Sequence, residues 1–387
     1  MFRVLQGMGG GLINPVGMTI GLRAVDPAHR GRLMSVLGLP VLVGPLAGPT
    51  LGGWLIDTLS WRWIYGVNIP IGILALVLGA QLIRADTPRP GARLDVRGLL
   101  MLSPGGALLV LGLTGLERPG GLANPTVFLP ALAGAGLLVW FAQRSLAHPA
   151  ALLRLELLTH RSLAAGAAAL FAFGAGYFGA AVILPTYVQV VRGDSATTAG
   201  LLAIPTALAT GLTLQLATRL VDTVSPRAIV VTGTLIAAGE VLATAWVLSA
   251  QTSYPLLMGV GAINGIGVGA TLMPTMTTAT RDLDHDELPS GTAIMSILQQ
   301  LAVALGIAVV SIVMAWSIDN HAPQLHGGGV AAVMALPDAA RNAIAAALAH
   351  ALQLTLLVPL ALMLCATAAA VCLPRRRMSA PASEVRA

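Results

Sequence analysis

The sequence predicts an all-α integral membrane protein, and three observations carry this prediction. Of the 387 residues, 56% are apolar and only 10% are charged, whereas about a quarter of the residues of a soluble protein are charged. The mean hydropathy is +0.82. The apolar stretches are unbroken runs dominated by Leu and Ala, unlike the alternating strands of a membrane β-barrel. A chain of this composition must turn most of its exterior toward lipid.

The apolar stretches have the length of membrane-spanning helices. About 20 helical residues cross the roughly 30 Å hydrocarbon core of a bilayer, and about eleven stretches satisfy that criterion. They cover residues 1–22, 33–56, 63–83, 98–116, 126–142, 163–188, 196–217, 228–248, 255–278, 290–316 and 347–373.

The arginines predict the orientation of the chain. All 22 basic residues are Arg, and most lie in alternate loops, which the positive-inside rule assigns to the cytoplasm. The tail with Arg375, Arg376 and Arg377 is therefore expected in the cytoplasm, and the N-terminus outside. Because the arginines form no basic helix face with interleaved aromatics, we expect no nucleic-acid partner. The first span opens directly at Met1, so we expect the chain to begin inside a longer protein.

Two distant segments resemble each other and indicate an internal repeat. Glycines at positions 7, 9 and 11 followed by Pro15 are echoed by glycines at 265, 267 and 269 followed by Pro274. Repeats of this kind are typical of secondary transporters. The alternative is a chance match, because glycine is common in membrane spans.

A run of small residues predicts a close contact between two helices. In GPLAGPTLGG, the residues Gly44, Gly48 and Gly52 lie four apart, with Pro49 and Gly53 beside them. Small residues four apart share one helix face and let a second helix approach at backbone distance, here at Gly48 and Gly52. Pro49 permits a bend. The contact is either a seam that hinges or seals, or static packing.

These motifs resemble those of a known family. The run from Gly44 to Gly53 matches the antiporter motif G-x-x-x-G-P-x-x-G-G of the major facilitator superfamily at every defined position. Segments 3–11 and 61–72 resemble the fourth-helix motif and the sixth-helix entry of its fourteen-helix drug:proton antiporter branch, the quinolone, dye and antiseptic exporters. The likeness covers essentially the whole chain. It implies a major facilitator fold in which this chain supplies helices four to fourteen and lacks the first three.

The resemblance also implies a division of the chain. Residues 1–84 would form the last three helices of an N-terminal bundle, residues 85–160 two linker helices with cytoplasmic loops, residues 161–373 a six-helix C-terminal bundle, and residues 374–387 a cytoplasmic tail.

A second family motif has a partial counterpart between two of the expected helices. Segment 218–227 resembles the cytoplasmic motif of the family, with Thr218 and Ser225 in place of the usual glycines. It implies a cytoplasmic latch of Arg219, Asp222 and Arg227, in which charges pair in one state and separate in another. For Arg227 alone, a solvated loop residue is the simpler interpretation.

Two charged residues lie within predicted spans, where a charge is a functional hypothesis by default. Glu240 lies in the middle of its span, and burial disfavours the charged carboxylate, as a proton carrier requires. The alternative is a neutral Glu240 that bonds to a neighbouring helix. Arg3 is expected deeper in the membrane if residues precede Met1, and the resemblance implies a role for it in proton transfer or substrate charge.

Further polar and aromatic side chains could line a substrate path or knit helices together. The candidates are Gln6, Gly7, Asn14, Tyr177, Tyr187, Gln189, Asn264, Gln299 and Gln300. Asp57 is expected to pair with Arg62 near a helix end.

The sequence therefore predicts a transporter and no enzyme. No hydrolase, metalloprotease or Walker motif is present, and we expect no cofactor and no metal site. The predicted function is proton-coupled export of a lipophilic or cationic drug or antibiotic by alternating access. The expected location is the plasma membrane, and the expected partners are a small-molecule substrate, protons and the lipid bilayer, with the protein a monomer. The alternatives are export of one endogenous metabolite, or a fragment or membrane scaffold that transports nothing.

Overall fold

The computed structural model describes most of the chain beyond residue 50. The described residues are 6–7, 9–11, 16–17, 20, 48, 51–82, 95–115, 124–148, 153–220, 224–284, 287–323 and 329–374. All regular secondary structure in these residues is helical, which confirms the predicted fold class.

Nine helices in the described residues are long and apolar enough to cross a membrane. They match the last nine predicted spans, and the first two predicted spans lie largely outside the described residues. The largest differences concern the last two spans, since one helix continues to His321 and the next begins at Asp338. Both extensions contain polar residues, which a hydropathy criterion excludes although a helix accommodates them.

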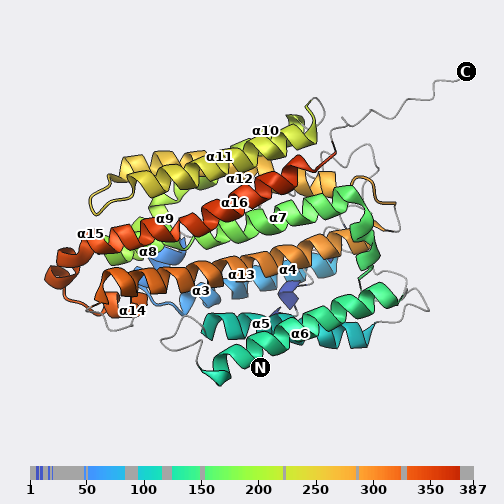
Figure 1. Cartoon of the computed structure of the whole chain (residues 1–387), viewed down its shortest axis with the longest axis horizontal. Helices are drawn as coiled ribbons and strands as arrows, with labels where there is room; N and C mark the ends of the chain where they lie inside the picture. Colours follow the sequence, from blue (N-terminus) through green and yellow to red (C-terminus); the bar gives the residue numbers. More distant parts are fainter. Residues whose placement is uncertain are drawn as a thin grey trace, which may run out of the picture.

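The elements follow one another along the chain, and Figure 1 labels the α-helices among them. They are α3 (Trp63–Gly66), α4 (Asn68–Leu82), α5 (Val96–Gly115), α6 (Pro125–Ala147), η3 (Leu155–Thr159), α7 (Arg161–Ala180), α8 (Ile183–Thr186), η4 (Tyr187–Val191), α9 (Ala196–Leu202), α10 (Ile204–Leu220), α11 (Pro226–Val247), α12 (Tyr254–Ala279), α13 (Leu288–His321), α14 (Gly329–Met334), α15 (Asp338–Thr355) and α16 (Leu357–Val371). Residues 51–58 form a further helical segment without a label.

Helix α12 lies between α10 and α11, and its glycines make this arrangement possible. A methyl group at Gly267 would lie 2.8 Å from the backbone nitrogen of Ala237 on α11. A methyl group at Gly269 would lie 2.5 Å from the carbonyl oxygen of Thr210 on α10. Only glycine permits both approaches, so the glycines of α12 serve helix packing.

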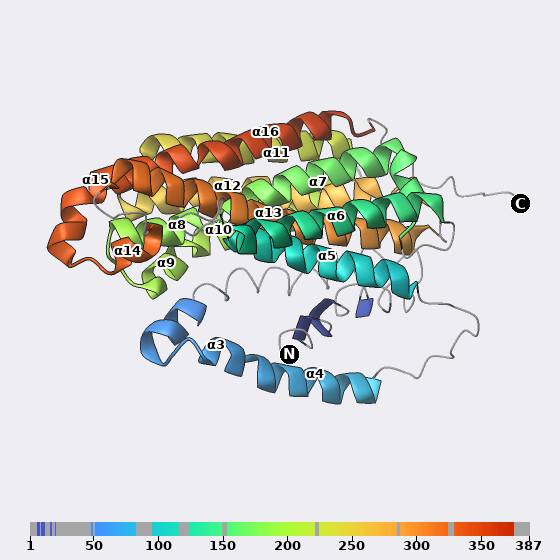
Figure 2. The ribbon, with the colours of Figure 1, turned by 60° about the horizontal axis from the view of Figure 1, so that its bottom comes forward.

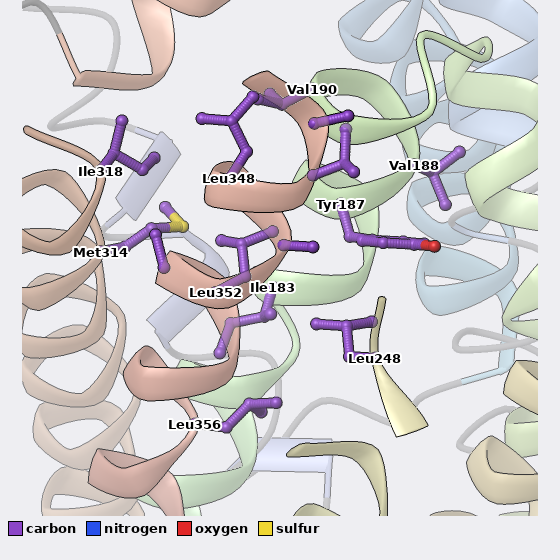
Figure 3. Close-up of a cluster of buried hydrophobic side chains, with 14 of the residues drawn as sticks. Ile183, Tyr187, Val188, Val190, Leu248, Met314, Ile318, Leu348, Leu352 and Leu356 are labelled. Carbon is purple, nitrogen blue, oxygen red and sulfur yellow. The ribbon is translucent and has the colours of Figure 1, made fainter. Parts of the chain in front are cut away.

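The largest apolar core joins α8, η4, α13 and α15 at one end of the bundle (Figure 3). Tyr187 lies within it with 0% of its surface exposed, beside Val188, Leu348 and Leu352. The Tyr187 hydroxyl donates a hydrogen bond to the carbonyl of Ser249 (2.7 Å), which satisfies its polar atom in apolar surroundings.

Helices α5 and α6 form a tight antiparallel pair. A methyl group at Gly134 of α6 would lie 2.6 Å from the carbonyl oxygen of Gly105 on α5. An ion pair joins the start of α5 to the last turn of α6, between Asp95 and Arg144 (2.7 Å). Phe141 of α6 belongs to an apolar cluster with Leu163 of α7 and Ile294 of α13, so the pair packs against the C-terminal helices.

Helices α3 and α4 lie apart from the other labelled helices, as Figure 2 shows. No residue of α4 is buried, and Ile69, Leu76 and Leu82 are among its exposed apolar side chains. In a membrane protein, such a surface faces lipid or further helices.

Candidate transport cavity

A cavity of about 470 Å³ lies where the helical segment 51–58 meets the C-terminal helices. Its volume is within the range of small-molecule sites, and its surface is mainly apolar. It is lined by Gly52, Gly53, Ile56, Tyr177, Ala180, Ala181, Ile183, Leu184, Pro185, Gln189, Ala196, Ala199, Gly200, Ala203, Thr206, Ala207, Thr210, Glu240, Val241, Thr244, Leu248, Leu257, Gly261, Asn264 and Leu356.

A local distortion of one membrane span forms part of the cavity wall. Helix α7 ends at Ala180, the short helix α8 begins at Ile183, and the π-helical turn η4 follows from Tyr187. Pro185 has no N–H, so it cannot bond to the carbonyl of Ala181 four residues earlier. Ala181 and Pro185 both line the cavity.

Glu240 is the acidic residue among the described lining residues, and two donors hold its carboxylate. The Thr244 hydroxyl donates to Oε1 (2.7 Å), and the Asn264 side-chain nitrogen Nδ2 donates to Oε2 (2.5 Å). Glu240 and Asn264 are 8% and 9% exposed. Both bonds favour a defined carboxylate position, while burial in apolar surroundings opposes the negative charge.

Tyr177 and Gln189 lie on the same membrane span and extend the polar part of the cavity wall. The Tyr177 ring stacks on Phe173 with a centroid distance of 6.2 Å and meets Phe178 edge to face at 4.9 Å. The Gln189 side-chain nitrogen donates to the Pro185 carbonyl (3.2 Å). An aromatic and apolar wall with a single carboxylate suits a lipophilic ligand, and a cation in particular.

The helical segment 51–58 closes one side of the cavity. A methyl group at Gly53 would lie 2.5 Å from the carbonyl oxygen of Ala196, at the start of α9. One turn later, Asp57 Oδ2 accepts hydrogen bonds from the Thr197 backbone N–H (2.8 Å) and hydroxyl (2.5 Å). The Thr197 hydroxyl and backbone N–H hold the pKa of the Asp57 carboxyl below its ordinary value.

The structure differs from two sequence predictions in and beside this segment. At Gly48 and Gly52, where the close approach was expected, a methyl group would have no neighbour within 4 Å among the described residues, and the backbone contact in this part of the structure occurs at Gly53. Asp57 bonds to Thr197 rather than to Arg62, whose guanidinium lies 5.0 Å from the centre of the Trp61 ring. The small-residue pattern indicates a contact, but the helix rotation decides which glycine makes it.

The structure brings together only some of the predicted path residues. Tyr177, Gln189, Glu240 and Asn264 line the cavity. Tyr187 is enclosed in the core, and Gln299 and Gln300 on α13 do not line the cavity.

The remaining predicted residues lie elsewhere. Gln6 and Gly7 are exposed and helical, and Arg227 lies in the first turn of α11. Arg3, Asn14, Gly44, Pro49, Asp222 and the side chain of Arg219 lie outside the described residues. No cluster of three or more metal-ligating side chains occurs in the described part of the chain.

Three cavity threonines were missed by sequence reasoning: Thr206, Thr210 and Thr244. Thr244 follows Glu240 by one helical turn, so the i, i+4 spacing was the available signal. Thr206 and Thr210 have the same spacing, but nothing in the sequence places α10 against the cavity.

Comparison with known proteins relates this chain to one protein family. The Major Facilitator Superfamily model matches residues 1–307. The chain is 35% identical over 325 residues to a Multidrug resistance protein B homolog of Mycobacterium tuberculosis, covering 83% of this chain and 60% of that protein. It is 31% identical over 326 residues to the Putative multidrug resistance protein MdtD of Klebsiella pneumoniae, covering 83% and 68%.

A third relative is similar over the same length. The chain is 28% identical over 319 residues to the Lincomycin resistance protein LmrB of Bacillus subtilis, covering 81% of this chain and 65% of that protein. The chain thus spans about two thirds or less of the length of the first curated relatives it matches. The family match confirms the predicted resemblance: the chain is a multi-pass membrane protein that belongs to the Major Facilitator Superfamily.

Proposed function

We propose that this chain forms part of a proton-coupled exporter of lipophilic cations, and that Glu240 is its proton-binding group. The observation that carries the proposal is a buried carboxylate in a mainly apolar cavity whose described lining residues include no Arg or His. A cation gains from the carboxylate and the Tyr177 ring, and an anion does not. The names of the relatives, which refer to multidrug and lincomycin resistance, support export of a drug or antibiotic.

The proposed mechanism is alternating access. The part of the chain around the helical segment 51–58 and the C-terminal helices would move against each other around the cavity. Uptake of a proton by Glu240 neutralises the carboxylate and removes its attraction for a cation. The loss of charge also shifts the equilibrium between the inward-facing and outward-facing states. We further propose the plasma membrane as the location, a cytoplasmic C-terminus, the division at residues 84, 160 and 373, and no enzymatic activity.

Membrane vesicles that contain the protein test this proposal. A pH gradient should drive movement of a lipophilic cationic dye, and Glu240→Gln should reduce the gradient-driven rate by at least tenfold while Glu240→Asp retains part of it. Glu156→Gln is the matched control, because Glu156 is exposed on η3 and pairs with Arg154 at 2.8 Å. An unchanged rate in Glu240→Gln would show that Glu240 carries no proton.

Export of a single endogenous metabolite is the competing function. The two are separated by a panel of unrelated lipophilic cations, because a cavity selective for one metabolite would transport none of them. A protein that moves no compound and no proton would support the scaffold alternative.

A further inference from the structure

The partners of Glu240 differ in what they can do when its charge changes. Asn264 Nδ2 donates to Oε2 across the contact between α11 and α12, and an amide nitrogen has no acceptor capacity. Thr244 Oγ1 donates to Oε1 from the next turn of the same helix, and a hydroxyl can both donate and accept. In this orientation Asn264 acts on Glu240 only as a donor, whereas the Thr244 hydroxyl can donate or accept.

Threonines on neighbouring helices of the bundle show where the Thr244 hydrogen can go. Thr210, Thr271, Thr275 and Thr355 each donate to the carbonyl four residues earlier, at 2.6 to 2.8 Å. This is the usual hydrogen bond of a threonine within a helix. Thr244 departs from it, since the corresponding carbonyl belongs to Glu240 but the hydroxyl bonds to the Glu240 side chain.

The backbone that carries Asn264 is held closely by its neighbours. The Gly267 contact with Ala237 fixes the separation of α12 and α11 one turn away from it. A methyl group at the neighbouring Gly265 would meet the carbonyl oxygen of Thr206 and lie 2.9 Å from Ala209 Cβ on α10, so α12 is held on both sides. A hydrogen bond from such a position anchors Oε2 in both protonation states.

We infer that Thr244 and Asn264 are positioning residues that set the proton affinity of Glu240, and that the proton binds at Oε1. On protonation, the Oε1–H group donates to Thr244 Oγ1, and the Thr244 hydrogen rotates to the Glu240 main-chain carbonyl. Oε2 continues to accept from Asn264. Every donor keeps an acceptor in both states, so the carboxyl group changes charge without leaving a buried polar atom unpaired. This inference rests on the proposed role of Glu240.

The surroundings of Glu240 contain few other groups that could titrate in its place. Tyr177 of α7 faces it, and α12 and α16 contain no acidic or basic residue between Tyr254 and Ala279 or between Leu357 and Val371. On α15, which meets only the end of α11, His350 bonds to Gln353 and Arg341 to Asp338. The helical segment 51–58 contributes Asp57, which is bonded to Thr197.

Infrared spectroscopy of the full chain in lipid nanodiscs tests the inference without requiring transport. The C=O band of the protonated Glu240 carboxyl is identified as the band that Glu240→Gln removes, and is followed between about pH 4 and pH 10. Thr244→Val and Asn264→Leu each remove a charge-assisted hydrogen bond from the carboxylate. Each should move the midpoint of the band upward by about one pH unit, a tenfold gain in proton affinity.

Two further variants make the result specific. Thr244→Ser keeps the hydroxyl and should restore the original midpoint. Thr210→Val removes a hydroxyl from the same cavity that bonds only to its own helix, and should leave the midpoint unchanged. The inference fails if the band titrates but Thr244→Val leaves its midpoint in place, or if Thr210→Val moves it equally. Absence of any titrating Glu240 band would overturn the proposed proton carrier itself.

Discussion

Asp57 and Thr197 are 140 residues apart in the sequence and share two hydrogen bonds, through the Thr197 backbone N–H and its hydroxyl. They join the helical segment 51–58 to the start of α9 directly beside the cavity that contains Glu240. The closest backbone contact of this segment, at Gly53, lies one turn away on the same face. The two contacts together form a closure on one side of the cavity.

Loss of the Asp57 carboxylate should loosen this closure. Asp57→Asn replaces an acceptor that bonds twice to Thr197 with a neutral amide, which is a weaker acceptor. With Cys365 and Cys372 changed to Ser and Thr206→Cys as a reporter, labelling by a membrane-impermeant maleimide should become severalfold faster. Thr58→Ala is the control, since the Thr58 hydroxyl bonds only to the Trp54 carbonyl of its own helix. Equal labelling rates in all variants would mean that the carboxylate does not hold the segment.

The same contact should weaken in acid. Because Thr197 lowers the pKa of Asp57 in the folded protein, the hydrogen bonds contribute their full stability above the unfolded value of about 4. That contribution is lost as the pH falls through the folded pKa. The difference in melting temperature between wild type and Asp57→Asn should therefore be present at neutral pH and shrink as the pH falls below 4. A difference that stays constant down to that pH would contradict the assignment.

One added methyl group should affect transport differently at two neighbouring glycines of the antiporter motif, Gly52 and Gly53. Gly53→Ala places its Cβ against backbone atoms of Ala196 and Thr197, which cannot move aside cheaply, whereas Gly52→Ala meets nothing within 4 Å. We expect Gly53→Ala to lower transport at least tenfold with normal amounts of protein in the membrane, and Gly52→Ala to retain most of it. The comparison is made by dye efflux normalised to membrane protein. If both variants lowered dye efflux equally, the close helix contact would not depend on Gly53.

The packing of α5 on α6 gives a prediction about stability. Gly134→Leu forces a side chain into the backbone of α5, near Leu109 and Gly105. Overpacking of this kind costs about 1–3 kcal/mol. Gly136→Leu is the matched control on the same helix, because a Cβ there has open space around it. The melting temperature in detergent should fall for the first variant and stay near wild type for the second. A similar melting temperature for both variants would contradict the tight α5–α6 contact.

Much of the fold could be predicted because the relevant properties are local. Burial of apolar groups and a helix of about 20 residues fix the number of spans, and the described spans agree with the predicted ones within a few residues apart from the two polar extensions.

The candidate site was predicted in part. Glu240 stands out as a charge in hydrocarbon, but Tyr177 and Tyr187 are equivalent in sequence although only Tyr177 lines the cavity. Ten residues at about 100° per residue place the two rings on different faces of the span, and only the packing of neighbouring helices decides which face lines the cavity.

The sequence by itself determined the membrane class, the positions of the described spans and the presence of a carboxylate within α11. Only the tertiary structure decided that Asn264 meets Glu240, that Thr197 meets Asp57, and that Gly53 rather than Gly48 or Gly52 makes the backbone contact. The reason is geometric. Periodicity and transfer free energy are properties of one helix, whereas the partner of a side chain depends on how two helices are rotated and how closely they approach.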